Sequence, residues 1–253
     1  MNKVHFVGAG PGATDLITVR GKELIKNADV IIYAGSLVNP ALLEFARNSC
    51  EIHNSAVMTL DEVIETIKNT VACNKNIVRL HTGDPSIYGA IREQMDKLSE
   101  LGIDYEICPG VSSFCAAAAS LKAEYTLPGV SQTVIITRVA GKTPVPEREA
   151  IRKLAAHGAT MVLFLSAGLI ETLSHDLIEG GYMPDTPAAM IYKASWPEEN
   201  IVRCTVADLA RCAVENNMTK TTLICIGSFL EGVYNLSRLY APDFSTEYRE
   251  ALL

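Results

Sequence analysis

The sequence predicts an α/β protein of two domains, with a mainly parallel β-sheet in the first and a mixed β-sheet in the second. In the first half, short apolar runs alternate with segments of helical periodicity, which is typical of repeated strand–loop–helix units. In the second half, polar positions interleave with the apolar runs, which indicates antiparallel strand pairs. Turn-forming residues cluster at Thr126–Ser131, so we expect domains of residues 1–125 and 126–253.

Composition narrows the class of protein. The chain has 253 residues, of which 48% are hydrophobic, enough for two hydrophobic cores, and its net charge is −7. Proteins that bind nucleic acid usually carry a basic face, which a net charge of −7 does not favour. No signal peptide is visible, and no apolar run approaches the ~18 residues that span a bilayer. We therefore expect a soluble, cytoplasmic protein without nucleic-acid or membrane partners.

The cysteines and histidines form no recognised metal or disulfide pattern. The seven cysteines contain no C-x-x-C pair, and the five histidines contain no H-x-x-x-H. An odd, irregularly spaced set of cysteines argues against a disulfide framework and against a structural zinc site. We expect no bound metal.

The elements of the first domain follow from its periodicity. Thr59 and Glu62 match a capping box, in which each side chain bonds the backbone N–H of the other residue, and Gly102 is placed to end a helix. We expect strands at residues 4–7, 30–33, 76–80 and 105–108, and helices around residues 24–28, 60–71, 90–98 and 114–119.

The second domain is expected to hold five strands and three helices. The strands are predicted at residues 133–137, 160–165, 188–192, 201–205 and 221–226, and the helices near residues 147–157, 169–179 and 206–216. The tail after Tyr240 is polar, and we expect it to wrap the surface or a partner.

A glycine-rich segment follows the first strand. Gly8–Ala13 satisfies G-x-G-x-x-G/A, the fingerprint of dinucleotide-binding loops. Two features weaken that interpretation: Pro11 has no N–H to offer a phosphate, and Asp29 lies before the second strand rather than at its end. An NAD-dependent oxidoreductase is therefore an alternative hypothesis for this chain.

The segment His81–Gly89 leaves the carboxyl end of the strand at residues 76–80. In open α/β sheets this edge binds ligands, and Gly83 and Gly89 let the backbone approach a ligand closely. Asp84 has two interpretations: its carboxylate caps the following helix, or it contacts a ligand.

Three segments together resemble the tetrapyrrole methylases. They are Gly8–Gly12, Gly83–Gly89 and Pro109–Ser113, each placed directly after a predicted strand. The resemblance implies an enzyme of two α/β domains, the tetrapyrrole methylase fold, that uses S-adenosylmethionine as methyl donor. It also implies a homodimer.

Further segments resemble one branch of that family, which methylates C11 of precorrin-4 or cobalt-precorrin-4 in cobalamin biosynthesis. They are Tyr33–Val38, Thr137–Arg138 and Gly141–Glu147. The uroporphyrinogen branch usually carries an acid after the tyrosine, where this chain has Ala34. That departure argues against the siroheme enzyme.

The resemblance implies two sets of binding residues. Contacts to S-adenosylmethionine are expected at Pro11, Thr82, Gly83, Asp84, Ile87, Tyr88, Ser112, Ser113, Leu165 and Ala194. The tetrapyrrole bears many carboxylates, and its binding is expected at Ser36, His81, Arg138 and Lys142, with Lys193 as a further basic candidate. For Leu165 the alternative is an ordinary core leucine of its strand.

The sequence leaves several alternatives open. It identifies no catalytic base, and it does not tell a cobalt-bearing substrate from a metal-free one. The rivals to C11 methylation are methylation of another corrin position, the uroporphyrinogen (siroheme) reaction, a non-catalytic tetrapyrrole-binding module, and the NAD-dependent oxidoreductase.

Overall fold

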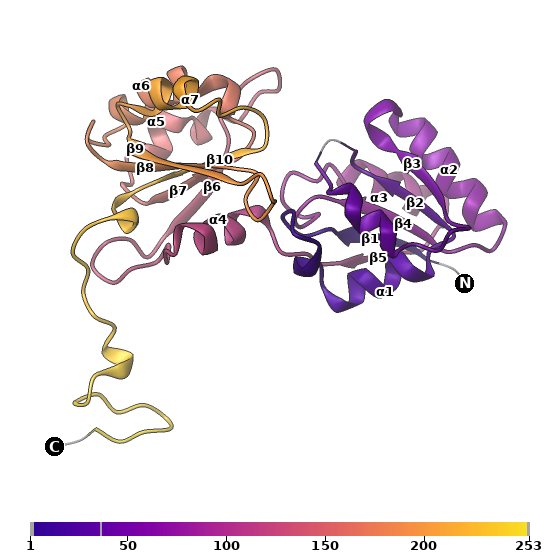
Figure 1. Ribbon diagram of the computed structural model, residues 1–253, viewed down its shortest axis with the longest axis horizontal. Helices are drawn as coiled ribbons and strands as arrows, with labels where there is room; N and C mark the ends of the chain where they lie inside the picture. The colour runs from indigo at the N-terminus through magenta and orange to yellow at the C-terminus, as the bar shows by residue number, and fades with distance from the viewer. Residues whose placement is uncertain (1–2, 36, 252–253) are drawn as a thin grey trace. The chain divides into compact units, whose positions relative to one another are not determined.

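The computed structural model describes residues 3–35 and 37–251 (Figure 1). The chain forms two compact units. The first comprises Met1–Ala117 together with Lys193–Asn200, and the second comprises Ala118–Tyr192 together with Ile201–Leu253. The short segment Lys193–Asn200 therefore follows a strand of the second unit in the chain but packs as part of the first.

The first unit is built on a five-stranded sheet in the order β3-β2-β4-β1-β5. All four pairs of neighbouring strands run parallel, which confirms the predicted parallel sheet. The strands are β1 (Val4–Gly8), β2 (Val30–Tyr33), β3 (Glu51–Asn54), β4 (Ile77–His81) and β5 (Tyr105–Cys108). The sequence analysis missed β3, an edge strand with one aliphatic residue and no buried position, so it carries no apolar run.

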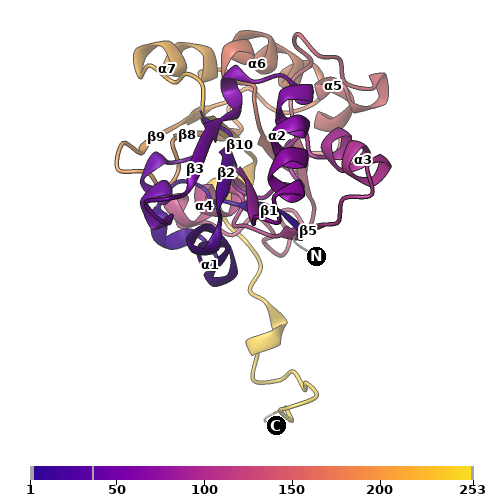
Figure 2. The ribbon, with the colours of Figure 1, turned by 90° about the vertical axis from the view of Figure 1, so that its right-hand side faces the viewer.

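Helices cover both faces of this sheet. On one face α1 (Val19–Asn27) packs on Val7, Val78 and Leu80. On the other face α2 (Leu60–Ala72) and α3 (Arg92–Glu100) lie side by side over Phe6 and Ile77 (Figure 2). The helix after β1, α1, and the helix after β4, α3, therefore lie on opposite faces of the sheet, although the two strands are neighbours. This arrangement opens a ligand crevice at the strand ends of α/β sheets. Short 3₁₀ helices fill the connections at Thr14–Leu16, Pro40–Phe45 and Ser55–Val57.

The capping box predicted at the start of α2 is confirmed. Thr59 Oγ1 accepts a hydrogen bond from the N–H of Glu62 at 3.3 Å, and Glu62 Oε2 accepts one from the N–H of Thr59 at 2.7 Å. Gly102 adopts the left-handed torsion expected after α3, with φ of 67°. The start of α3 was predicted two residues too early, since the helix begins at Arg92.

The second unit contains a five-stranded sheet in the order β6-β7-β10-β8-β9. The pair β6–β7 is parallel and the pairs β7–β10 and β10–β8 are antiparallel, which confirms the predicted mixed sheet. The strands are β6 (Val134–Thr137), β7 (Thr160–Leu163), β8 (Pro187–Tyr192), β9 (Asn200–Thr205) and β10 (Thr222–Ile226). Strand β7 ends two residues earlier than predicted.

Three helices cover one face of the second sheet (Figure 1): α5 (Ile151–Ala155), α6 (Ile170–Glu179) and α7 (Leu209–Glu215). They share one core with the sheet, in which Leu173 and Leu209 meet Met161. Helix α4 (Ser113–Leu121) connects the two units along the chain. The remaining short helices are at Glu147–Glu149, Ala167–Leu169, Ser228–Leu230 and Arg238–Tyr240.

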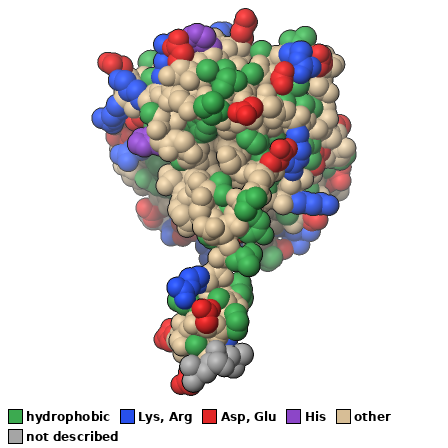
Figure 3. Space-filling view, turned by 90° about the vertical axis from the view of Figure 1, so that its left-hand side faces the viewer, with side chains coloured by type: hydrophobic (Ala, Val, Ile, Leu, Met, Phe, Trp, Pro, Cys, Tyr) green, Lys and Arg blue, Asp and Glu red, His purple; other side chains and the backbone are tan. Residues whose placement is uncertain are grey.

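The carboxyl-terminal tail has mainly local contacts. The guanidinium of Arg249 donates to the carbonyl oxygens of Leu239 (3.0 Å), Ala241 (2.7 Å) and Phe244 (3.2 Å). Hydrophobic side chains stay exposed along the tail (Figure 3). Tyr248 is 93% exposed. The hydrogen bonds of Arg249 are local to the tail, and wrapping of the surface or of a partner by the tail stays a prediction. Over residues 3–35 and 37–251, no helix combines the length and apolar character needed to cross a membrane.

Replacing Thr59 by alanine should lower the free energy of unfolding by about 1 kcal/mol, because the amino end of α2 then loses the side-chain acceptor for the Glu62 N–H. Urea unfolding followed by circular dichroism measures the change. Thr219→Ala, at an exposed loop position, is the matched control and should leave the midpoint unchanged. Equal stability of both variants would contradict the role given to the capping box.

Candidate ligand site at the strand ends

Three loops gather at one edge of the first sheet. The loop Gly8–Ala13 lies at the end of β1, Thr82–Gly89 follows β4, and Pro109–Ser112 follows β5. These three strands are neighbours in the sheet, in the order β4-β1-β5. Because the strands are parallel, their carboxyl ends meet at this edge. The three motifs that are far apart in the sequence therefore form one surface within the first unit.

The loops pack backbone against backbone. Gly10 and Gly83 exchange two hydrogen bonds, with N···O distances of 3.2 and 2.8 Å. A Cβ on Gly8 would lie 2.6 Å from the Gly83 carbonyl oxygen, and one on Gly110 would lie 2.2 Å from the same atom. No side chain fits at either position, so these glycines are required by the contact between the loops.

The carboxylate of Asp84 joins two of the loops. Its Oδ2 accepts from the N–H of Gly110 at 2.8 Å, and its Oδ1 accepts from the N–H of Ser86 at 2.9 Å and from the Ser86 hydroxyl. Partial burial acts to raise the pKa of this carboxyl, but the bonds from Ser86 and Gly110 outweigh it and hold the pKa below its usual value. The alternative that Asp84 caps the next helix is wrong, because α3 begins eight residues later, at Arg92.

The corner after Asp84 holds an unusual backbone. Tyr88 and Ala90 have left-handed torsions, with φ of 55° and 50°, and the Tyr88 side chain is 44% exposed. Such conformations are costly for residues with a Cβ and persist where surrounding contacts impose them. Here the buried Gln94 side chain donates to the Ala90 carbonyl at 3.0 Å and accepts from the buried Arg79 at 3.1 Å.

His81 ends β4 beneath this corner. Its side chain is 3% exposed and its ring lies 6.0 Å from that of Phe6, centroid to centroid. Burial, with a smaller contribution from the charge of Arg79, lowers the pKa of His81 to about 3. The imidazole is therefore neutral, and it does not supply the positive charge for which the sequence analysis chose it.

The remaining cofactor candidates of the first unit differ in burial. Ser112 is buried, Thr82 and Ile87 are half-buried, and Ser113 begins α4. Ala194 is 5% exposed. It lies between Lys193 and Ser195, whose φ values of 48° and 70° are also left-handed.

The glycine-rich loop has little free backbone to offer a phosphate. The Ala9 N–H donates to the His81 carbonyl at 2.7 Å, and the Ala13 N–H donates to Ser195 Oγ at 3.1 Å. The Pro11 and Gly12 carbonyls accept from Trp196 Nε1 (2.9 Å) and Asn39 Nδ2 (2.8 Å). A dinucleotide cradle needs free N–H groups, so this pairing weighs against the oxidoreductase alternative.

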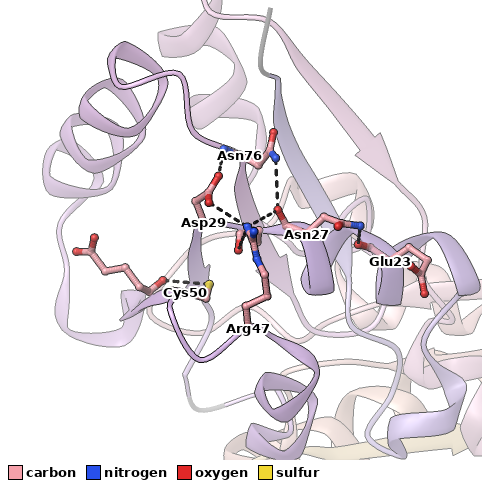
Figure 4. A network of polar contacts seen from close by, with 8 residues as sticks. Glu23, Asn27, Asp29, Arg47, Cys50 and Asn76 are labelled. Carbon is pink, nitrogen blue, oxygen red and sulfur yellow. Dashed lines mark hydrogen bonds and ion pairs between the residues drawn. The ribbon is translucent and has the colours of Figure 1, made fainter.

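The Asp29 carboxylate binds protein groups away from the glycine-rich loop. Its carboxylate accepts from Arg47 at 2.9 Å and from the N–H of Asn76 at 2.8 Å (Figure 4). These contacts lie before β2 and β4, at the amino ends of the strands and away from the glycine-rich loop. Asp29 therefore ties the sheet together and is not placed to bind the ribose of a dinucleotide.

In the second unit, the loop after β6 and the loop after β7 are joined by a buried serine. Ser166 is fully buried, its Oγ accepting from the Val139 N–H at 2.9 Å and donating to the Phe164 carbonyl at 2.7 Å. Leu165, between Phe164 and Ser166 in the chain, has φ of 53° and is 65% exposed. The alternative that Leu165 is a core leucine is therefore wrong.

The basic candidates have different roles in the structure. Arg138 donates to the carbonyls of Thr143 (3.1 Å) and Pro144 (2.7 Å), which folds the loop after β6, and Lys142 is exposed on that loop. The Lys193 ammonium lies 3.7 Å from the Glu198 carboxylate. Ser36 lies outside the described residues. Within residues 3–35 and 37–251, no three His, Cys, Asp or Glu side chains are grouped as a metal site.

Sequence reasoning missed three residues of this region: Asn39, Ser195 and Trp196. Trp196 bonds to a residue 185 positions away, so no local pattern links the two. The one available signal was that the chain contains a single tryptophan.

Comparison with known proteins gives a consistent result. Residues 3–210 match the sequence model of the tetrapyrrole (corrin/porphyrin) methylases. A cobalt-precorrin-4 C(11)-methyltransferase of Methanocaldococcus jannaschii is 55% identical over 250 residues, which cover 98% of this chain and 96% of the relative.

Two solved structures are similar as well. A cobalt precorrin-4 methyltransferase of cobalamin biosynthesis has a TM-score of 0.89 at 46% identity, covering 91% of this chain and 96% of its own. The uroporphyrin-III C-methyl transferase of Thermus thermophilus, complexed with S-adenosyl homocysteine, has a TM-score of 0.76 at 25% identity, with coverage of 91% and 94%.

The burial of His81 predicts a pH dependence of stability. The pKa of a histidine is 6.5 in an unfolded chain and about 3 here, so between these values only the unfolded state binds the proton. Stability therefore falls as pH decreases, by up to about 1.4 kcal/mol per unit from this group. His81→Gln should flatten the fall between pH 6.5 and 4 in urea unfolding, and His175→Gln, at an exposed position, should not. Parallel curves for all three proteins would contradict this assignment.

Proposed function

The chain belongs to the tetrapyrrole methylase family, and on that premise we propose that it is an S-adenosylmethionine-dependent methyltransferase acting on C11 of precorrin-4 or cobalt-precorrin-4. The observation that carries the proposal is the 55% identity, over nearly the whole of both chains, with a relative of that activity. That relative acts on the cobalt-bearing compound, which favours cobalt-precorrin-4 as the substrate.

The residues of the first unit fit the methyl donor. Thr82, Asp84 and Ile87 of the corner are half-buried, and Tyr88 is 44% exposed. Asp84 places a negative charge there, which suits a cationic sulfonium. We propose that donor contacts in the first unit come from Pro11, Thr82, Gly83, Asp84, Ile87, Tyr88, Ser112, Ser113 and Ala194. Leu165, an exposed residue of the second unit, remains a donor candidate on resemblance alone.

The proposed reaction needs no covalent bond between the protein and the reactants. The donor supplies an activated methyl group, and a nucleophilic ring carbon displaces it in line. The chain's own residues then serve to bind, orient and desolvate the reactants. A rigid corner suits this task, because Asp84 and Gln94 fix its backbone on two sides. No residue is assigned as a base.

Substrate binding is proposed for three basic residues, of which Lys142 is exposed and the Lys193 side chain is 25% exposed. Lys142 and Lys193 carry charges that suit carboxylates, and Arg138 shapes the loop that holds Lys142. The neutral His81 can take part only through neutral hydrogen bonding or packing. Ser36 remains a substrate candidate on resemblance alone. A homodimer and a cytoplasmic location stay predictions, the first to be checked by light scattering on the purified protein.

The methyl-donor site is tested by calorimetry with S-adenosylhomocysteine. We expect micromolar binding, on the order of −8 kcal/mol, that Asp84→Ala weakens at least about tenfold, because Gly110 and Ser86 lose their charged acceptor. Asp96→Ala, an exposed acid of α3, is the matched control and should bind like the wild type. Unchanged binding in Asp84→Ala would leave Asp84 as a loop tie only. Binding of NAD in place of S-adenosylhomocysteine would overturn the family function.

The ring position is tested with a labelled methyl group. Purified enzyme, labelled donor and precorrin-4 or cobalt-precorrin-4 should give one product with the label on C11, read by mass spectrometry and carbon NMR. A label on another carbon would contradict the proposed position, and methylation of uroporphyrinogen III would favour the siroheme reaction. Binding of substrate without turnover in the presence of donor would favour a non-catalytic binding module.

A further inference from the structure

The single tryptophan of the chain lies against the glycine-rich loop. Trp196 Nε1 donates to the Pro11 carbonyl at 2.9 Å, and a Cβ on Gly12 would lie 2.0 Å from ring atom Cδ1. The Gly12 backbone does not use the left-handed region, so its own torsions admit a side chain. Gly12 is thus required by the indole. This contact accounts for a glycine of the dinucleotide-like motif that the methyltransferase function leaves unexplained.

The turn that carries Trp196 is held in a strained form. Lys193 and Ser195 both have left-handed torsions, and they flank the buried Ala194. Ser195 is fixed on two sides: its N–H donates to Glu199 at 2.7 Å, and its Oγ accepts from Ala13 of the glycine-rich loop at 3.1 Å. Such torsions are unfavourable for residues with a Cβ, so these contacts decide the conformation of the turn.

The ammonium of Lys193 adds a contact within the turn. It lies 5.0 Å from the centre of the Trp196 ring, within the range of a cation–π interaction. The indole is therefore held by the Pro11 carbonyl, by the close approach of Gly12 and by Lys193, and a rotation of the ring would disturb the loop and the turn together.

We propose that Trp196 is a positioning residue for the methyl donor: its indole locks the turn Lys193–Ser195 to the glycine-rich loop and thereby sets the position of Ala194. The inference rests on the proposed function, in which Ala194 contacts the donor. Trp196 itself acts through Ala194 and the loop. Loosening the indole should weaken donor binding more than it weakens the fold.

The first experiment removes only the indole donor. Trp196→Phe keeps an aromatic ring and loses the bond to Pro11, and we expect about 5-fold weaker binding of S-adenosylhomocysteine by calorimetry, the factor of one hydrogen bond. The thermal midpoint should stay within about 2 °C. Tyr248→Phe, the same kind of change on a ring that is 93% exposed, should match the wild type. Wild-type affinity in Trp196→Phe would overturn the proposal.

The second experiment tests the close approach. Gly12→Ala should weaken binding of S-adenosylhomocysteine about tenfold or more, because the new methyl group displaces the indole. In Trp196→Ala, which empties that space, adding Gly12→Ala should cost less than twofold further. Additive losses in the double variant would overturn the proposal, since contacting residues couple and independent ones add.

The fluorescence of Trp196 gives a direct measure of donor binding. Its emission should shift on titration of the wild type with S-adenosylhomocysteine, with the dissociation constant found by calorimetry, whereas unchanged emission during binding would count against the proposal. These experiments distinguish a failure of the methyltransferase function from a failure of the positioning role of Trp196. Wild type that binds no S-adenosylhomocysteine contradicts the methyltransferase function, while wild type that binds it, with Trp196→Phe binding equally well, contradicts only the role of Trp196.

Discussion

The close backbone contact among three loops is the constraint on which the candidate site depends. The Gly83 carbonyl lies where a side chain on Gly8 or Gly110 would have to be, so the loops meet only because these positions have no Cβ. The Asp84 carboxylate then joins the corner to the Gly110 backbone. Steric closeness sets the distance between the loops, and a charge-assisted hydrogen bond sets their register.

Buried polar groups stabilise the carboxyl-terminal edge of the first sheet. Arg79 and Gln94 lie within the apolar layer formed by the sheet and the helices α2 and α3, and they bond to each other and to backbone carbonyls. Polar groups buried in this way specify one arrangement, since any other would leave donors unpaired. Five of the nine non-glycine residues with described left-handed torsions are binding candidates or lie next to the candidate segments: Tyr88, Ala90, Leu165, Lys193 and Ser195. Strain of this kind concentrates at functional sites.

One sequence motif here serves a purpose different from its usual one. Gly8–Ala13 satisfies the pattern of a phosphate loop, yet its backbone groups pair with Gly83, His81, Ser195, Trp196 and Asn39. Glycine is selected by close approach, whether the group that approaches is a phosphate, another backbone or an indole ring. The pattern therefore predicted that something lies close to the loop and did not identify it.

The sequence by itself determined the α/β class, the parallel and mixed sheets, most strand positions and the capping box of α2, because these follow from the local spacing of apolar and capping residues. Resemblance in three short segments also indicated the family. Only the tertiary structure decided how individual side chains are used. His81 is buried and neutral, Leu165 is exposed, Asp84 ties two loops, and Trp196 covers Gly12. Burial and pairing of this kind depend on partners up to 185 residues away in the chain, which no local pattern records.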